Sequence, residues 1–133
     1  MLISAKRSLL LLPPAPPREM AREAARPLAL LHAAAERLQV PAVSMNSPNW
    51  RVGLATGRNQ LVAAGPLSEA DLTGLPPGTA AFQVIDCLGE DERPPESAWS
   101  GMAAIPVTAE MVVFEWLERG ATAAFRDLIA LIR

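Results

Sequence analysis

The fold is decided by one short stretch near the end of the chain, Val107-Thr108-Ala109-Glu110-Met111-Val112-Val113-Phe114-Glu115-Trp116-Leu117. Its first residue ends an apolar run, and Thr108 stands where an N-cap hydroxyl accepts hydrogen bonds from the free amides of a helix start. Glu110 in the first turn complements the helix dipole. Three large apolar residues of the stretch share one helical face: Val113, Trp116 and Leu117. The stretch therefore predicts a strand that leads directly into a helix with one buried face.

Working outward from this stretch, five apolar runs predict five strands. They cover Ser8–Leu12 and residues 40–45, 59–64, 80–85 and 103–107. The first run is apolar from Leu9 onward and is closed by Pro13 and Pro14, the pattern of a central strand buried on both faces.

Helical patterns fill the spaces between these runs. Residues 18–39 carry apolar residues at steps of four and three, but Pro27 interrupts them, so the helix either kinks there or begins at Pro27. Shorter helices are predicted over residues 50–56, ended by Gly57, after the N-cap or first-turn residue Ser68, and over residues 97–102. A final amphipathic helix is predicted by the spacing of four apolar residues: Phe125, Leu128, Ile129 and Ile132.

Strands that alternate with helices across short loops predict an α/β fold. We expect a three-layer α/β/α arrangement with a mostly parallel, five-stranded sheet, doubly wound in the manner of Rossmann folds. A chain of 133 residues is long enough for one core, so residues 1–133 are expected to form one domain.

Composition excludes several classes of function. The net charge of the chain is −2 and the charged residues are dispersed along it, so we expect no nucleic-acid partner. No segment approaches the roughly 18 apolar residues of a membrane span, and Pro13 stops the first apolar run too early for a secretory signal. A single cysteine cannot form an intrachain disulfide. We therefore expect a cytoplasmic protein without a membrane partner.

Several of these pieces, in order and spacing, resemble the isochorismatase-like cysteine hydrolases. Residues 8–12 are similar to their first strand, residues 56–65 (Thr-Gly-Arg-Asn-Gln-Leu-Val-Ala-Ala-Gly) to the stretch before their nucleophile, and residues 82–86 (Phe-Gln-Val-Ile-Asp) to their next strand. The tail from residue 108 to residue 132 is the closest piece. The resemblance implies the same α/β fold and, as in relatives, a homo-oligomer.

The catalytic residues that the resemblance implies are missing from their places. The family's Asp ends the first strand, and that place falls here at Pro13 or Pro14. The segment that carries its Lys is shortened to residues 45–58, which contain no Lys. The position of its nucleophilic Cys falls at Asp71. Because thiol attack needs a base, a cation and an oxyanion site, the resemblance predicts a lost triad.

Six residues expected near the carboxyl ends of the strands form a candidate pocket, since parallel sheets bind ligands at that edge. They are Pro14, Asn46, Ser68, Asp71, Asp86 and Cys87. A structural interpretation stands beside each functional one. Cys87 is a nucleophile or a buried apolar residue, Asp71 a ligand contact or a helix-start carboxylate, and Asp86 an acid or a loop-orienting acceptor. In each case we favour the structural interpretation.

Other residues with reactive or aromatic side chains have simpler interpretations. Lys6 precedes the first strand, so we expect it at the opposite edge of the sheet from the pocket. His32 is the only histidine, within a helix, so we expect neither a metal site nor a cofactor. Of the three tryptophans, Trp116 is expected in the core and Trp50 at an interface with a partner.

The leading hypothesis is a degenerate isochorismatase-like domain without catalytic activity, acting through binding or assembly into a homo-oligomer. One alternative is a small hydrolase with a rebuilt active site around Asp71, Asp86 or Cys87. Another is a sensor that keeps the crevice and binds a small molecule without turnover.

Overall fold

A computed structural model describes residues 3–14 and 22–117 of the chain. Five strands form one sheet, in the order β2-β1-β3-β4-β5, and every neighbouring pair is parallel. Their bounds are β1 Ser8–Leu12, β2 Ala42–Ser44, β3 Gln60–Ala63, β4 Ala80–Val84 and β5 Ile105–Val107. The sheet thus confirms the five predicted strands, most of them slightly shorter than predicted.

Strand order places a switch point between β1 and β3. The chain runs from β1 outward to β2 on one side, then returns to β3 beside β1 and continues outward to β5 on the other side. Leu10 at the centre pairs with Ala42 of β2 and with Val62 of β3. In open α/β sheets of this order, ligands bind outside the carboxyl ends of the strands at such a switch point.

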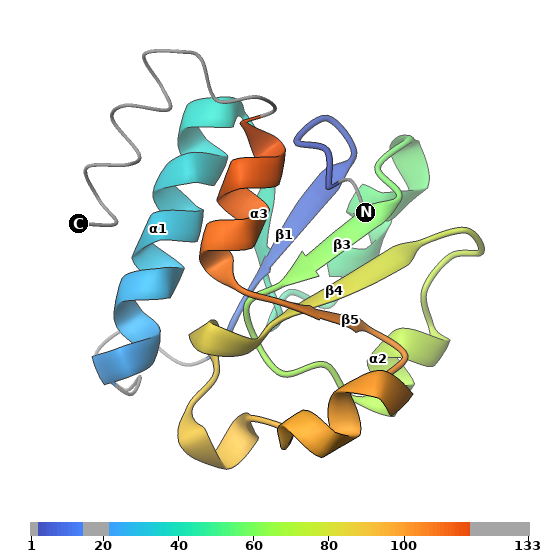
Figure 1. Ribbon diagram of the computed structural model, residues 1–133. Helices are drawn as coiled ribbons and strands as arrows, with labels where there is room; N and C mark the ends of the chain where they lie inside the picture. Colours follow the sequence, from blue (N-terminus) through green and yellow to red (C-terminus); the bar gives the residue numbers. More distant parts are fainter. Residues whose placement is uncertain (1–2, 15–21, 118–133) are drawn as a thin grey trace.

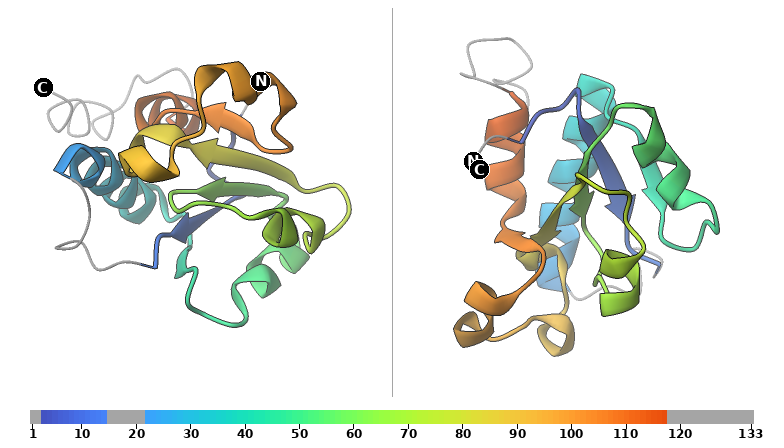
Figure 2. Two further views of the ribbon diagram at one scale, coloured as in Figure 1. Left: turned by 90° about the horizontal axis from the view of Figure 1, so that it is seen from below. Right: turned by 90° about the vertical axis from the view of Figure 1, so that its right-hand side faces the viewer.

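Helices cover both faces of the sheet. Their bounds are α1 Arg22–Leu38, α2 Glu69–Thr73 and α3 Ala109–Trp116, with four 3₁₀-helices: η2 Trp50–Thr56, η3 Ile85–Cys87, η4 Glu90–Glu92 and η5 Glu96–Gly101. The long helices α1 and α3 pack side by side on one face (Figure 1). Of the elements in the described part of the chain, only the short η2 and α2 cover the other face (Figure 2). The predicted three layers are confirmed, but one layer is thin.

Two apolar cores follow from these layers. Leu10, Val62 and Phe82 point toward α1 and α3 and belong to the larger core, together with Val113 and Trp116. The smaller core lies under η2 and contains Leu9, Leu11, Trp50, Leu54, Leu61 and Ala63. Successive residues of β1 enter opposite cores, which confirms that this strand is buried on both faces.

Capping residues in the sequence predicted several helix ends correctly. Thr108 caps α3 by accepting the Met111 amide through Oγ1 at 3.2 Å, and Gly57 ends η2 with a left-handed φ of 94°. Helix α1 (Arg22–Leu38) runs through Pro27, so of the two alternatives the one in which the helix begins at Pro27 is wrong. Packing of its apolar stripe against the sheet outweighs the hydrogen bond that Pro27 cannot donate.

One predicted feature falls outside the described residues: the final amphipathic helix that contains Phe125, Leu128, Ile129 and Ile132. Over residues 3–14 and 22–117, no helix is long and apolar enough to cross a lipid bilayer.

Candidate functional site

The carboxyl edge of the sheet is where the six candidate pocket residues were expected. Each follows the end of a strand: Pro14 follows β1, Asn46 β2, Ser68 and Asp71 β3, Asp86 and Cys87 β4. The structure groups them into three local pairs, and each pair makes its own contacts.

Pro14 and Asn46 form the first pair. The Asn46 side-chain amide Nδ2 donates to the Pro14 carbonyl at 3.3 Å, and the Asn46 backbone amide donates to Ser44 Oγ at 3.1 Å. Both residues are exposed. Asn46 therefore ties the loop after β2 to the loop after β1, and its donors point into these loops.

The loops after β1 and β3 approach closely beside this pair. Gly65 follows β3, is buried, and faces the start of the loop after β1. A Cβ atom added to Gly65 would lie 2.9 Å from Pro13 Cα and would also overlap Met45 Sδ. Such a separation is below van der Waals contact, so a side chain at residue 65 does not fit without a shift of its neighbours.

The loop after β3 is fixed by a buried glutamine of β4. Gln83 is 3% exposed, and its Nε2 donates to the carbonyls of Ala63, at 3.2 Å, and Gly65, at 2.9 Å. Its Oε1 accepts the Leu67 amide at 3.0 Å. One side chain thus satisfies three backbone groups and holds this loop against the sheet. No local sequence pattern predicts this role.

Ser68 and Asp71 form the second pair, a capping box at the start of α2. Ser68 Oγ accepts the Asp71 amide at 3.1 Å, and Asp71 Oδ2 accepts the Ser68 amide at 3.0 Å. Asp71 Oδ1 also pairs with Arg51 at 3.3 Å. Both carboxylate oxygens therefore have protein partners at the position that corresponds to the family's nucleophile.

The prediction that Trp50 lies at an interface with a partner is corrected by the structure. Its side chain is 5% exposed and belongs to the smaller core. The Arg51 guanidinium stacks over the indole, 4.3 Å from the ring centroid. The thin layer on this face has few large residues, so Trp50 supplies much of the apolar cover of β1 and β3.

Cys87 and Asp86 form the third pair, in η3. Cys87 is 2% exposed and lies in the larger core. Burial raises the pKa of its thiol far above the ordinary value, the negative charge of Asp86 raises it further, and Arg93 opposes the shift weakly. A thiol in this setting stays protonated, which removes the form that attacks carbonyl groups.

The Asp86 carboxylate points to the start of α3 and away from the larger core, which contains the Cys87 thiol. Its Oδ1 accepts the Ala109 amide at 2.9 Å, as the loop-orienting interpretation predicted. Burial raises the pKa of Asp86 above the ordinary value, while backbone hydrogen bonds and the Arg93 charge partly counteract it. Asp86 and Thr108 thus accept from two of the free amides of α3.

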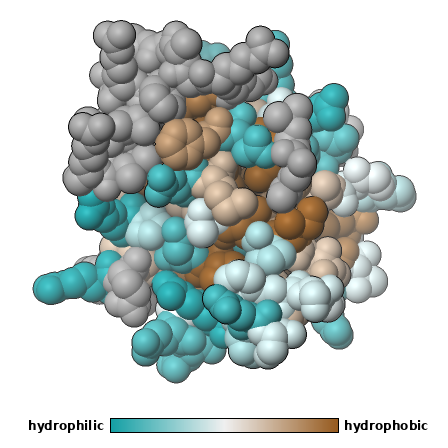
Figure 3. All heavy atoms as spheres, in the orientation of Figure 1, coloured by the Kyte–Doolittle hydropathy of each residue, from teal (hydrophilic) through white to brown (hydrophobic). Residues whose placement is uncertain are grey.

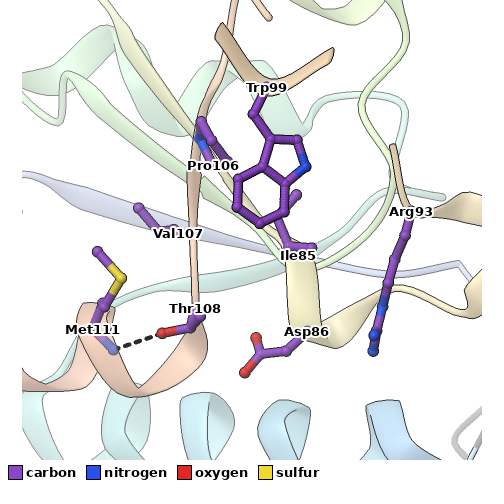
Figure 4. Close-up of a pocket in the computed structure, with 8 residues that line it drawn as sticks. All are labelled: Ile85, Asp86, Arg93, Trp99, Pro106, Val107, Thr108 and Met111. Atoms are coloured by element: carbon purple, nitrogen blue, oxygen red, sulfur yellow. Dashed lines mark hydrogen bonds between the residues drawn. The ribbon is translucent and has the colours of Figure 1, made fainter. Parts of the chain in front are cut away.

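A cavity of about 140 Å³ opens beside Asp86, beyond the carboxyl ends of β4 and β5 (Figure 4). Its lining is mostly apolar: Ile85, Asp86, Arg93, Trp99, Pro106, Val107, Thr108 and Met111. Of these lining residues, Asp86 alone was among the six predicted pocket residues. Arg93 and Trp99 were missed because they come from the irregular segment between β4 and β5, where sequence spacing does not predict which side chains meet.

The remaining candidates lie away from this edge. Lys6 is exposed and precedes the amino end of β1, so it lies at the opposite edge, as predicted. His32 is exposed on α1. In the described part of the chain, no three His, Cys, Asp or Glu side chains come together as a metal site.

Comparisons with known proteins bear on the fold. No family model matches the sequence, and no curated protein matches it. Among solved structures, the chain is similar to the MAR1 ribonuclease from Caenorhabditis elegans, with a TM-score of 0.72 and 16% sequence identity. The match covers 99% of this chain and 92% of that one. At this identity the similarity concerns the fold alone, and it confirms the α/β fold class.

Proposed function

We propose that this chain is a degenerate isochorismatase-like domain that does not catalyse hydrolysis and acts through binding or self-assembly. One observation carries the proposal. The candidate groups at the carboxyl edge do not converge, since Asp71 lies in the capping box of α2 whereas Cys87 is buried in the larger core.

The chemistry of the remaining candidates supports the same proposal. Pro13 offers no acid or base, both Asp71 oxygens are engaged in a cap and an ion pair, and the Cys87 thiol is held protonated in the core. A rebuilt hydrolase would need two of its three candidate groups, Asp71, Asp86 and Cys87, to face one open space. Of these, only Asp86 lines the cavity.

Hydrolysis assays on the purified chain test the proposal. We expect no turnover of simple amide or ester substrates above that of the Cys87→Ala variant, which is the matched control. In parallel, a thiol reagent should react with native Cys87 at least about a hundredfold more slowly than with the chain unfolded in denaturant, because the thiol is buried. Turnover that disappears in Cys87→Ala, or in Asp71→Asn, would overturn the proposal.

Assembly is the first of the two proposed modes of action. Three of the exposed large apolar residues lie on the edge strand β5 and on α3: Ile105, Met111 and Phe114, each 41–46% exposed. Hydrophobic surface is visible in the middle of this face in Figure 3. Covering such surface with a second copy would remove it from water, and this favours a homo-oligomer.

Light scattering at micromolar concentration tests assembly. We expect a mass above that of one chain, and a shift to the mass of one chain in Met111→Lys. Val52→Lys is the matched control, because Val52 is 63% exposed on η2, which covers the opposite face of the sheet. A wild-type mass equal to one chain would remove the assembly mode.

Binding of a small molecule is the second mode, and the cavity beside Asp86 favours it. It lies at the carboxyl edge, has apolar walls and contains two charged groups, Asp86 and Arg93. These are the properties of small-molecule sites in general. A sensor without turnover would use this cavity.

A further inference from the structure

We propose that the cavity beyond β4 and β5 binds one apolar ring of the size of benzene, whose buried part carries neither a charge nor a hydrogen-bonding group. This inference rests on the proposed binding mode and names the ligand class for it. The wall composition, the directions of the charged side chains and the volume of the cavity each narrow the class.

The walls of the cavity present mainly carbon and sulfur atoms. Five apolar side chains make up most of the lining: Ile85, Trp99, Pro106, Val107 and Met111 (Figure 4). Trp99 and Pro106 lie on one side of the space and Met111 on another. A ligand that displaces water from these side chains removes apolar surface from solvent, which is favourable for an apolar ligand.

The polar atoms of the uncharged wall residues already have partners within the protein. Trp99 Nε1 donates to the Pro94 carbonyl at 3.1 Å, and Thr108 Oγ1 accepts the Met111 amide at 3.2 Å. Pro106 has no backbone N–H to offer. A ligand atom that needs a hydrogen bond would therefore lose water and gain little in return.

The two charged lining residues do not share a space in which they could hold a polar ligand. Figure 4 shows their charged ends diverging on either side of η3. Asp86 Oδ1 accepts the Ala109 amide at 2.9 Å, which turns the carboxylate to the start of α3. Arg93 Nε donates to the Leu88 carbonyl at 3.1 Å, which holds the guanidinium on the other side. The ligand is therefore recognised by shape and apolar contact.

The volume of the cavity indicates a single ring. It is about 140 Å³, close to the roughly 150 Å³ of an apolar cavity that holds benzene. Sites for drug-sized ligands are larger, about 300–1,000 Å³. The hydrogen bond from Trp99 to Pro94 fixes the indole, so this wall is formed before a ligand binds. Indole and thioether groups favour an aromatic ring over a saturated one.

A titration with benzene, followed by NMR of the Met111 methyl and Trp99 indole signals, tests the inference. We expect saturable shifts of both signals with a dissociation constant on the order of 1 mM, as suits so small a ligand. Pyrimidine is the matched control, because it has the shape of benzene with two nitrogen acceptors. It should bind at least about tenfold more weakly, since its nitrogens would lose water without meeting a donor.

Variants of the full chain localise the binding. Trp99→Ala should weaken benzene binding by about tenfold, and Trp99→Phe should keep it within about threefold, since an aromatic wall remains. Arg93→Met should also keep it within about threefold, because the guanidinium is not used and an apolar stem is retained. Arg22→Met, an exposed substitution on α1, should leave it unchanged. Thermal unfolding of each variant checks that a loss of binding is not a loss of fold.

Four outcomes would overturn the inference. They are no saturable shift at either reporter, equal binding of pyrimidine, a tenfold loss in Arg93→Met, and benzene binding that strengthens on dilution of the chain. The last would mean that a side chain of a second copy competes for the cavity. A failed titration leaves the absence of turnover intact, whereas turnover dependent on Cys87 would sink the proposed function without changing the titration.

Discussion

The Trp116 indole Nε1 donates to Ser8 Oγ at 2.9 Å, a buried hydrogen bond between residues 108 positions apart. Ser8 is fully buried at the start of β1, and its own hydroxyl donates to the Ser4 carbonyl at 2.7 Å. The bond fastens α3 to the central strand at the amino edge of the sheet. Buried indole N–H groups need such a partner, so this contact is expected to contribute to stability.

Ser8→Ala should lower the free energy of unfolding by about 2 kcal/mol, because the indole N–H of Trp116 loses its buried acceptor. Urea unfolding measures this. Ser97→Ala, at an exposed position of η5, is the matched control and should change stability by less than about 0.5 kcal/mol. A double-mutant cycle with Trp116→Phe should show that the two effects are not additive. Full additivity would mean that the hydrogen bond does not contribute.

Gly65→Ala should destabilise the fold by about 1–3 kcal/mol, because the added methyl group overlaps Met45 Sδ and Pro13 Cα. Adding Met45→Ala should recover only part of the loss, since the Pro13 backbone remains in place. Gly101→Ala is the control, because a Cβ there would meet nothing within 4 Å. Equal stability of the Gly65 and Gly101 variants would show that Gly65 is not closely packed against Pro13 and Met45.

Gln83→Leu should cost about 3 kcal/mol, because it leaves two carbonyls and the Leu67 amide without their buried partner. Hydrogen exchange at the Leu67 amide should accelerate more than global unfolding explains. Unchanged exchange at Leu67 would contradict the assigned role of Gln83.

Gln39→Gly should stabilise the chain by about 1 kcal/mol. Gln39 follows α1 with a left-handed φ of 60°, its amide donates to the Glu36 carbonyl at 3.3 Å, and the Val40 amide donates to the Ala35 carbonyl at 2.8 Å. These bonds form a Schellman cap, in which glycine avoids the strain of a Cβ. Gln39→Ala keeps that strain and should give no gain in the midpoint of thermal unfolding.

Asp86→Asn should change how stability depends on pH. Burial raises the folded pKa of Asp86 above its ordinary value of 3.8, so the folded state binds more protons than the unfolded state between these two values. The Asp86 contribution to stability therefore falls as pH rises through that window. Asn keeps an oxygen for the Ala109 amide but cannot titrate. The variant minus wild-type difference in unfolding free energy should thus grow from about pH 4 upward, and a flat difference would contradict the shift.

Local sequence signals predicted many elements of the fold but few of the site contacts. The caps at Thr108 and Ser68 and the two-sided burial of β1 follow from neighbouring residues, and the structure confirms them. Trp50 was placed wrongly, because its burial depends on how little else covers that face. Arg93 and Trp99 went unnoticed, because an irregular segment has no periodicity that predicts which side chains face one another.

The alternation of strands and helices, and the parallel sheet expected from it, follow from the sequence alone. They depend on residue type and on spacing within about a dozen positions. The tertiary structure was needed to show that Gly65 packs against Pro13 and Met45 and that a cavity opens beside Asp86. Both features depend on the separation of side chains from different strands and loops, which close packing sets and chain order does not.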